Sequence, residues 1–431
     1  MKKITVSLLL ISSLISFKLV AQDANAIINK AETERIEKYL SSDELEGRKT
    51  FSKAIDKAAD FIANEFKQAG LKTFNSNDTY LQKFTRMSAR FIAASGSFDG
   101  VAVDTKNLIV ITAQPTVTIT ENSGYDIVKI NKEDNFGLTA RKVIMANKNV
   151  IVLVDESFAN MFGRLVQMKS NITAQQKTIV FVLGSLTPTK YTIEATHKIE
   201  ELALANVVGV IPGKSLPNEY VIFSGHYDHL GINGAKAING DSIYNGANDD
   251  AAGTTAMIML SKYFKKLKNN ERTLVFVAFT AEEVGGFGAQ YFSKQFDPLT
   301  VKAMFNLEMI GTESKWGKNS AYITGYEKTN MGEILQKNLE GSAFKFYPDP
   351  YTDQNLFYRS DNATLARLGV PAHTISTSKM DSEPNYHKPS DQFETLDMDN
   401  MNEIIKAIAI SSKSIISGKD TPSRVDTTQL K

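Results

Sequence analysis

Apolar residues recur every three to four positions in two stretches near the amino terminus, "INKAETERIEKYLSS" and "FSKAIDKAADFIANEFKQAG". This spacing predicts two helices between residues 24 and 70, with Gly70 ending the second. From about residue 91 to 210 the pattern changes to short Val- and Ile-rich runs separated by polar turns: "NLIVITA", "KVIMANKNVIVLVDES" and "KTIVFVLGS". Runs of this kind favour a mostly β module.

A third pattern begins at Tyr220, where strand-like apolar runs alternate with helical ones. The strand-like runs are "YVIFSG", "TLVFVAFTA", "VKAMFNLEMI" and "PAHTISTS", and the helical ones are "AAGTTAMIMLSKYFKKLK" and "FGAQYFSKQF". The stretch "NMNEIIKAIAISSKSIISG" then reads as a closing helix. The alternation predicts an α/β fold, a three-layer α/β/α arrangement around a mixed, mostly parallel sheet, with a smaller β-rich inserted module.

These changes of pattern define the expected domains. Residues 22–90 and 206–418 would form the main domain, residues 91–205 the β-rich insert, and residues 419–431 a polar tail. No internal repeat interrupts this plan.

The first residues have the pattern of a secretory signal peptide, residues 1–21. Lys2 and Lys3 precede an apolar run, and Ala21 offers a small residue for cleavage. An uncleaved membrane anchor is the alternative, but the run is shorter than the ~20 residues of a spanning helix, and Lys18 interrupts it. We therefore expect an exported protein, periplasmic or extracellular, that is not membrane-bound after cleavage.

Composition narrows the possible chemistry. The chain has no cysteine, which excludes disulfides, thiolate metal ligands and a cysteine nucleophile. Its 49 Lys and Arg nearly balance its 48 Asp and Glu, and no basic block argues for nucleic acid as a partner. A metal ion would have to be held by carboxylates and some of the five histidines.

Acidic and imidazole groups stand where the predicted strands end, the edge at which ligands gather in a parallel sheet. These residues are His226, Asp228, Asp249, Asp250, Glu282, Glu283 and Glu308, with His387 further along in "NYHKPSD". Imidazole and carboxylate suit zinc. Two histidines with three carboxylates can hold two ions if one carboxylate bridges them, and a neighbouring carboxylate can then act as a general base.

Five motifs resemble, in order and spacing, those of the co-catalytic di-zinc aminopeptidases, a family that also holds glutamate carboxypeptidase II and the glutaminyl cyclases. They are "GHYDHLG", "GANDDAAG", "FTAEEVGGFGAQYF", "NLEMIG" and "YHKPSD". The similarity extends from Tyr220 to Ser417. "LSSDELEGRKT" is similar to the family's amino-terminal signature, and the insert resembles a protease-associated module only loosely.

The resemblance implies two zinc ions and five ligands. His226 and Glu308 would bind one zinc, Glu283 and His387 the other, and Asp249 would bridge the two. The Asp249–Asp250 peptide would be cis.

The resemblance also implies the catalytic groups. Glu282 would be the general base, and Asp228 would hydrogen-bond the far nitrogen of His226 and fix its tautomer. The implied activity is that of an exopeptidase, an aminopeptidase acting on peptides with a free amino terminus. Side-chain preference and oligomeric state are not predicted.

Two positions depart from the family pattern. Glu308 stands where the family usually has aspartate, so its longer side chain could hold its zinc less tightly. Asn362, in "YRSDNATLARLGVPAH", stands where the family usually has histidine, which puts a substrate contact there in doubt.

The remaining histidines and other enzyme classes fit the sequence differently. His197 and His373 are predicted to be structural, and His229 to lie at the rim of the site. A serine hydrolase lacks support because no Gly-x-Ser-x-Gly elbow occurs, and "GGFG" lacks the spacing of a dinucleotide site. A glutaminyl cyclase with a single zinc, or a non-catalytic binding protein on the same fold, remain as alternatives.

Overall fold

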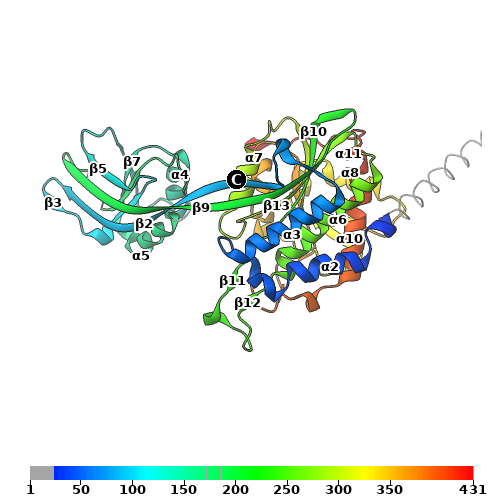
Figure 1. The fold of residues 1–431 in the computed structure, drawn as a ribbon. Coiled ribbons are helices and arrows are strands. Elements are labelled where there is room, and N and C mark those ends of the chain that lie inside the picture. The colour runs from blue at the N-terminus through cyan, green and yellow to red at the C-terminus, as the bar shows by residue number, and fades with distance from the viewer. Residues whose placement is uncertain (1–23, 170–171, 185–186, 431) are drawn as a thin grey trace, which may run out of the picture. The chain divides into compact units, whose positions relative to one another are not determined.

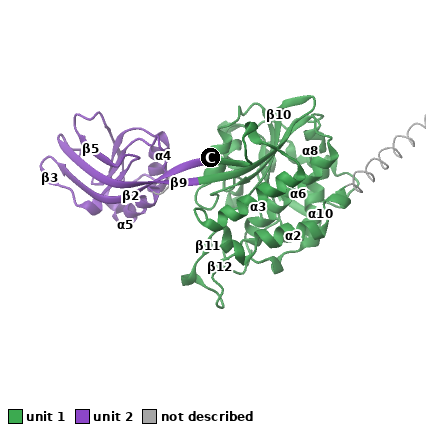
Figure 2. Ribbon diagram, viewed as in Figure 1, with its two compact units in different colours: residues 1–83, 204–431 green, residues 84–203 purple. Residues whose placement is uncertain are grey.

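The computed structural model describes residues 24–169, 172–184 and 187–430, so the predicted signal peptide lies outside the described residues. The described residues form two compact units (Figure 2): unit 1 comprises those within 24–83 and 204–430, and unit 2 comprises those within 84–203. Within the described ranges, no helix has both the length and the apolar character needed to cross a membrane.

Unit 1 is built on a mixed sheet whose centre is parallel. Its four central strands are β13 (Arg272–Phe279), β10 (Leu216–His226), β14 (Val301–Leu307) and β17 (Ala372–Ser376), each parallel to its neighbour in that order. On one side, β15 (Ser320–Ile323) runs antiparallel to β17 and parallel to β16 (Lys345–Pro348). On the other, the end of β9 (Tyr191–Ile211) pairs antiparallel with β13 and with the short β1 (Lys72–Thr73). The predicted mostly parallel sheet is confirmed.

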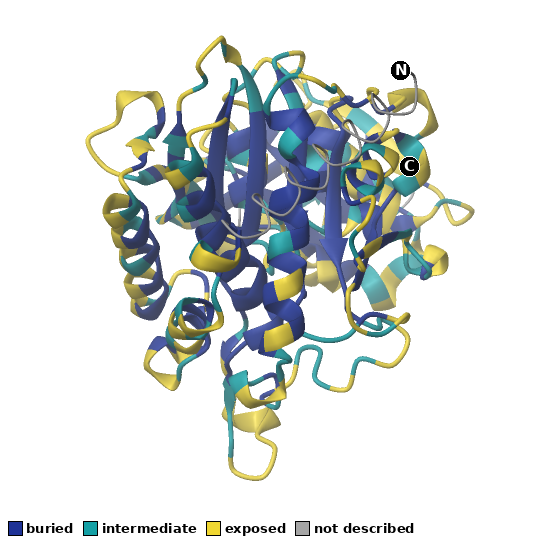
Figure 3. Cartoon of the chain, turned by 90° about the vertical axis from the view of Figure 1, so that its right-hand side faces the viewer, coloured by how far each residue is buried: buried dark blue, intermediate teal, exposed yellow. Residues whose placement is uncertain are grey.

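Helices cover both faces of this sheet (Figure 1). The helices on one face are α2 (Lys30–Leu40), α3 (Lys53–Ala69), α6 (Ala252–Leu267), α8 (Met331–Asn338) and α10 (Met398–Ser411), which is followed by the short α11 (Lys413–Ile416). The other face carries α7 (Phe287–Ser293) and α9 (Asn362–Ala366). Within β10, Val221 and Phe223 join the first core while Ile222 joins the second, as strand geometry requires. The strands themselves are buried (Figure 3), which makes the unit a three-layer α/β/α fold.

The two predicted amino-terminal helices form, and their ends have the expected caps. The Ser52 side chain accepts a hydrogen bond from the Ile55 N–H at the start of α3, and Gly70 ends the helix at φ 76°. Residues 419–430, expected as a polar tail, are part of unit 1 and contact its other elements. There Val425 is buried, and Arg424 donates to the Val301 carbonyl.

Unit 2 combines strands with a helix. Its four-stranded sheet has the order β4 (Leu108–Ile111), β8 (Ile179–Leu183), β7 (Val150–Val154) and β6 (Asp126–Ile130). A second group of strands contains β5 (Thr116–Thr120), paired with β9, and the outer part of β2 (Leu81–Phe98), paired with β3 (Val101–Ala102).

One strand prediction in unit 2 is wrong. Residues 142–146, part of a Val- and Ile-rich run, belong to α4 (Phe136–Ala146), and the short α5 (Ala159–Phe162) follows later. Asn135 starts α4 by accepting a hydrogen bond from the Leu138 N–H, and Asn147 ends it in a left-handed conformation. These caps and the burial of Phe136 and Ala140 outweigh the β preference of the run.

A buried carboxyl group in α2 predicts how the stability of unit 1 depends on pH. Glu37 is fully buried, and one of its oxygens accepts a hydrogen bond from the Thr255 hydroxyl at 2.7 Å. Burial raises the pKa of Glu37 from its usual 4.5 to about 8. Because the folded state holds this proton more tightly than the unfolded chain, the stabilisation is complete below about pH 4.5 and is lost as the pH rises toward 8.

We therefore expect the free energy of unfolding of a Glu37→Gln variant to fall less between pH 5 and 8 than that of the wild type. The limiting slope for one group is about 1.4 kcal/mol per pH unit. Denaturant titrations at several pH values measure this difference. Glu34→Gln, at a less buried position of the same helix, is the matched control. Parallel pH profiles for wild type and Glu37→Gln would contradict the prediction.

Candidate metal centre

Three neighbouring strands bring candidate ligands to one edge of the sheet. His226 is the last residue of β10, Glu308 follows β14 directly, and Glu282 and Glu283 follow β13. Since β14, β10 and β13 are adjacent and parallel, their carboxyl ends meet. Asp249 enters this edge from the turn that precedes α6.

One group of ligand atoms forms around His226. Its Nε2 lies 3.2 Å from Asp249 Oδ1 and 3.2 Å from Glu308 Oε1. The second oxygen of Glu308 accepts a hydrogen bond from the Ser360 hydroxyl at 2.5 Å. The Nδ1 of His226 lies 3.0 Å from the backbone carbonyl of Asp228, so this nitrogen carries the proton and Nε2 is left with its lone pair for a metal ion.

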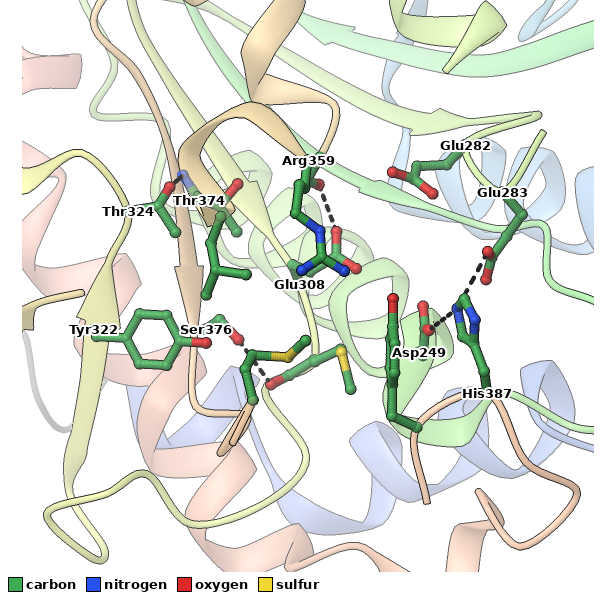
Figure 4. A pocket seen from close by; sticks show the side chains of 15 residues that line it. Asp249, Glu282, Glu283, Glu308, Tyr322, Thr324, Arg359, Thr374, Ser376 and His387 are labelled. Atoms are coloured by element: carbon green, nitrogen blue, oxygen red, sulfur yellow. Dashed lines mark hydrogen bonds and ion pairs between the residues drawn. The ribbon is translucent and has the colours of Figure 1, made fainter. Parts of the chain in front are cut away.

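A second group forms around His387 on the other side of Asp249 (Figure 4). The Nε2 of His387 lies 3.2 Å from Asp249 Oδ2 and 3.3 Å from Glu283 Oε2. The two oxygens of Asp249 therefore face two different histidines. The structure brings together all five predicted ligands, and Asp249 stands between the two groups as a bridge would.

These separations fit zinc. Ligand atoms at 2.0–2.1 Å from one tetrahedral ion are about 3.3 Å apart, which is close to all four distances between histidine nitrogens and carboxylate oxygens. The site also favours positive charge. Although burial opposes it, the carboxylates of Asp249 and Glu283 raise the pKa of His387 to about 10. The donor chemistry and spacing of the two groups thus suit two divalent cations.

The contact predicted for the Asp228 carboxylate is corrected by the structure. The carboxylate lies 3.9 Å from His226 Nδ1, and the backbone carbonyl of Asp228 accepts that hydrogen bond instead. The buried carboxylate accepts from the N–H groups of Glu282 at 3.0 Å and Glu283 at 3.3 Å, and from the Thr50 hydroxyl at 2.9 Å. Asp228 therefore positions the backbone of the predicted base and its neighbour.

The turn that carries Asp249 is held by two further carboxylates. The Asp249–Asp250 peptide is cis, as predicted. Asp391 accepts hydrogen bonds from the Asn248 N–H at 2.8 Å and the Asp249 N–H at 3.0 Å, and Asp250 accepts from the His226 N–H at 3.1 Å. This network fixes the position of Asp249 through its backbone.

The amino-terminal signature reaches the same loops through Arg48. Its guanidinium is completely buried and donates to the carbonyls of Tyr227 at 2.8 Å, Asn245 at 2.5 Å and Gly246 at 2.9 Å, and also to that of Leu40. One side chain thus links the loop after β10 to the turn that leads to Asp249. Sequence reasoning identified the motif "LSSDELEGRKT" but did not predict this contact.

The remaining histidines divide into structural and site residues. His373 is buried in β17, where its ring nitrogens contact the Thr324 carbonyl and the Thr329 hydroxyl, each at 2.8 Å, so the predicted core role is confirmed. His197 is buried in β9 of unit 2. His229 was expected at the rim, but it is buried, with Nδ1 2.7 Å from Glu283 Oε1.

His229 therefore supports a predicted ligand, and its ligating atoms also cluster with those of Asp249 and Glu283. Asn362 does not line the pocket. It is fully buried and bonds to the Phe357 and Ala372 carbonyls and the Thr374 hydroxyl.

A pocket of about 540 Å³, open to solvent at its mouth, adjoins the two ligand groups. Glu282 extends into it, separate from the ligand pairs (Figure 4), and burial raises the pKa of its carboxyl well above its usual range. Tyr386 lines the pocket and stacks on the His387 ring at 4.0 Å. The other lining residues are Met309, Tyr322, Thr324, Leu356, Arg359, Ser360, Thr374, Ser376 and Met380.

A sequence model described as Peptidase family M28 matches residues 206–411, just under half of the chain. This match agrees with the ligand geometry and with the order of the motifs. The matched region is therefore similar to peptidase family M28.

Relatives and solved structures carry consistent names. A probable leucine aminopeptidase of Trichophyton verrucosum is 31% identical over 211 residues, which are 47% of this chain and 54% of that protein. Aminopeptidase YwaD of Bacillus subtilis is 23% identical, over 49% of this chain and 45% of that protein. The chain thus spans about half the length of these curated relatives.

Solved structures share the fold. An aminopeptidase from Aneurinibacillus sp. strain AM-1 superposes with a TM-score of 0.55 at 16% identity, covering 95% of this chain and 98% of that one. A zinc aminopeptidase from Bacillus subtilis gives 0.54 at 17%, covering 94% and 97%. These similarities support the α/β fold class predicted from the sequence.

Proposed function

We propose that the protein is a di-zinc aminopeptidase. The observation that carries this proposal is the shared carboxylate: each oxygen of Asp249 stands 3.2 Å from a different histidine, and each histidine has a further carboxylate beside it. His226, Glu308 and Asp249 would hold one ion, and His387, Glu283 and Asp249 the other. The names of the relatives support removal of an amino-terminal residue as the activity.

The two zinc ions would supply a Lewis acid for the scissile carbonyl and lower the pKa of the attacking water. Glu282 would take the proton from that water and deliver it to the leaving amine, because its carboxylate lies in the pocket and its backbone is held by Asp228. Its raised pKa favours keeping the proton between these two events, although bound cations would lower that pKa. Tyr386 also lines the pocket, and its hydroxyl would be a donor for the carbonyl oxygen as negative charge develops.

Metal analysis combined with a substrate panel tests the proposal. We expect two zinc ions per chain and cleavage of aminoacyl substrates with a free amine, but not of blocked peptides. One zinc with formation of pyroglutamate from amino-terminal glutaminyl peptides would indicate a cyclase. Absence of both zinc and turnover would favour a binding protein. Export, implied by residues 1–21, forms part of the proposal and is tested by cell fractionation.

Glu308 provides a test of the first zinc ion. One of its carboxylate oxygens lies beside His226 Nε2, and the other accepts a hydrogen bond from the Ser360 hydroxyl. The backbone at position 308 is therefore placed for a side chain of the length of glutamate. Glu308→Asp should draw the carboxylate back and weaken one zinc site by roughly 10- to 100-fold, the range typical of disturbed ligand support. Dilute chelator should then remove that ion first.

Calorimetric zinc titration of Glu308→Asp measures the effect. Ser360→Ala, which removes the hydrogen bond but keeps the ligand, should weaken the same site less. Unchanged affinity for both ions in Glu308→Asp would show that Glu308 is not a ligand.

A further inference from the structure

Arg359 is a cation on the wall of the pocket with no acidic partner among the described residues. It precedes Ser360, and its guanidinium points into the pocket (Figure 4). Its side chain forms one long hydrogen bond, 3.5 Å from Nη1 to the Gln354 side-chain oxygen. Within the described part of the chain, no carboxylate oxygen forms an ion pair with Arg359, that is, none lies within 4.0 Å of its guanidinium nitrogens. This holds although Glu308 lines the same pocket.

With two zinc ions bound, the positive charge of Arg359 would have no negative counterpart among the groups that line the pocket. The carboxylates that line it are Asp249, Glu282, Glu283 and Glu308. Two divalent zinc ions would neutralise these four groups. A guanidinium stays protonated at all working pH values and binds carboxylates through a planar fork of N–H donors. With the metal ions bound, Arg359 would therefore present a positive charge to whatever enters.

The surrounding wall offers no other charge. Opposite the metal centre it consists of hydroxyl groups and apolar side chains, among the described residues Tyr322, Thr324, Leu356, Thr374, Ser376 and Met380. These groups can accommodate many side chains but cannot discriminate by charge. Arg359 is thus the group on this wall that can distinguish an anionic substrate from a neutral one of the same size.

We propose that Arg359 selects substrates with a carboxylate within one residue of the scissile bond, an inference that rests on the proposed aminopeptidase function. Two kinds of peptide offer this group: one whose first residue is acidic, and a dipeptide, whose terminal carboxylate follows the scissile amide directly. In both, the carboxylate enters the pocket together with the reacting atoms. A long neutral peptide presents no such group.

Two pairs of substrates distinguish an acidic first residue from the terminal carboxylate of a dipeptide. Glutamyl- and methionyl-p-nitroanilide have first residues of similar length and differ in charge, and Ala-Ala and Ala-Ala-amide differ only at the terminal carboxylate. We expect the carboxylate-bearing member of at least one pair to have a kcat/KM about 10- to 100-fold higher, as for a charge-assisted hydrogen bond. The advantage should shrink in 0.5 M salt, because Arg359 is exposed.

Variants assign the effect to this side chain. Arg359→Gln should lose about 10- to 100-fold on the preferred carboxylate substrate and much less on its neutral partner, and Arg359→Lys should restore part of the difference. Arg367→Gln is the matched control, because Arg367 is an exposed arginine at the end of α9 that does not line the pocket. It should keep the wild-type preference.

The outcomes separate this inference from the proposed function. Equal rates within both pairs, or an equal loss on both members in Arg359→Gln, would overturn the role of Arg359 while leaving aminopeptidase activity in place. If no substrate is turned over, the proposed function fails. In that case, calorimetric binding of Ala-Ala and Ala-Ala-amide to the Glu282→Gln variant tests the role of Arg359 without turnover. Equal affinities refute this role. Tighter binding of Ala-Ala that is lost when Arg359→Gln is added supports it.

Discussion

Replacement of Glu282 by Gln is expected to lower kcat by at least ~10²-fold while zinc content stays nearly unchanged. A positioned general base typically contributes 10²- to 10⁴-fold, and the amide of glutamine cannot accept the proton. Glu282 lines the pocket but takes part in neither ligand group, so the substitution would remove a ligand from neither proposed zinc ion. The Asp228 carboxylate holds residue 282 through its backbone N–H, a contact that the substitution preserves.

Steady-state kinetics and zinc analysis of the same preparation measure both halves of this prediction. Glu283→Gln is the informative comparison, because the neighbouring carboxylate lies 3.3 Å from His387 Nε2 and should cost zinc as well as activity. A Glu282→Gln enzyme that keeps most of its turnover would show that another group accepts the proton. Loss of zinc from Glu282→Gln would instead identify Glu282 as a ligand.

That several candidate ligands lie together could be predicted because their grouping follows from strand ends. Each of β10, β13 and β14 contains a largely apolar run, and the polar residue that ends such a run must lie at an edge of the sheet. In parallel neighbours these edges coincide, so His226, Glu283 and Glu308 are close in space although far apart in the sequence. Asp249 and His387 lie in loops, where no hydrophobic periodicity marks a position. They were predicted as ligands from the resemblance of their motifs to the family.

The contacts that support the ligands could not be predicted in the same way. Thr50 and Asp228 are 178 positions apart, and Arg48 contacts carbonyl groups rather than side chains, so neither contact leaves a pattern in the sequence. Asp228 was expected to use its carboxylate on His226, yet its backbone does so, because that carboxylate is already engaged with two N–H groups. Arrangements of this kind depend on how loops pack.

His229 shows how little proximity in the sequence decides. It lies three residues after His226, and that spacing alone does not separate a place inside the site from one at its rim. Burial decides the matter here: the ring is enclosed, and its Nδ1 reaches Glu283 at 2.7 Å. A buried imidazole beside a carboxylate restrains that carboxylate, as supporting residues do in many metal sites.

Replacement of Asp249 by Ala is expected to remove both zinc ions together and abolish measurable activity. Each oxygen of Asp249 faces a different histidine at 3.2 Å, so one truncation takes a ligand from both ions. It also takes away the negative charge between them, so that the mutual repulsion of two cations at close range would be less well offset. The loss of affinity should therefore exceed the 10- to 100-fold typical of residues that only support a ligand.

The fold around position 249 should survive this change. The N–H groups of Asn248 and Asp249 are held by the Asp391 carboxylate, and these backbone contacts do not involve the deleted side chain. Zinc analysis and calorimetric titration of Asp249→Ala measure the result, with His226→Ala as the comparison that should weaken mainly one ion. A bridging ligand contacts both ions, so retention of one full equivalent of zinc by Asp249→Ala would refute the bridging role. Loss of both ions, with an unchanged melting profile of the metal-free protein, would support it.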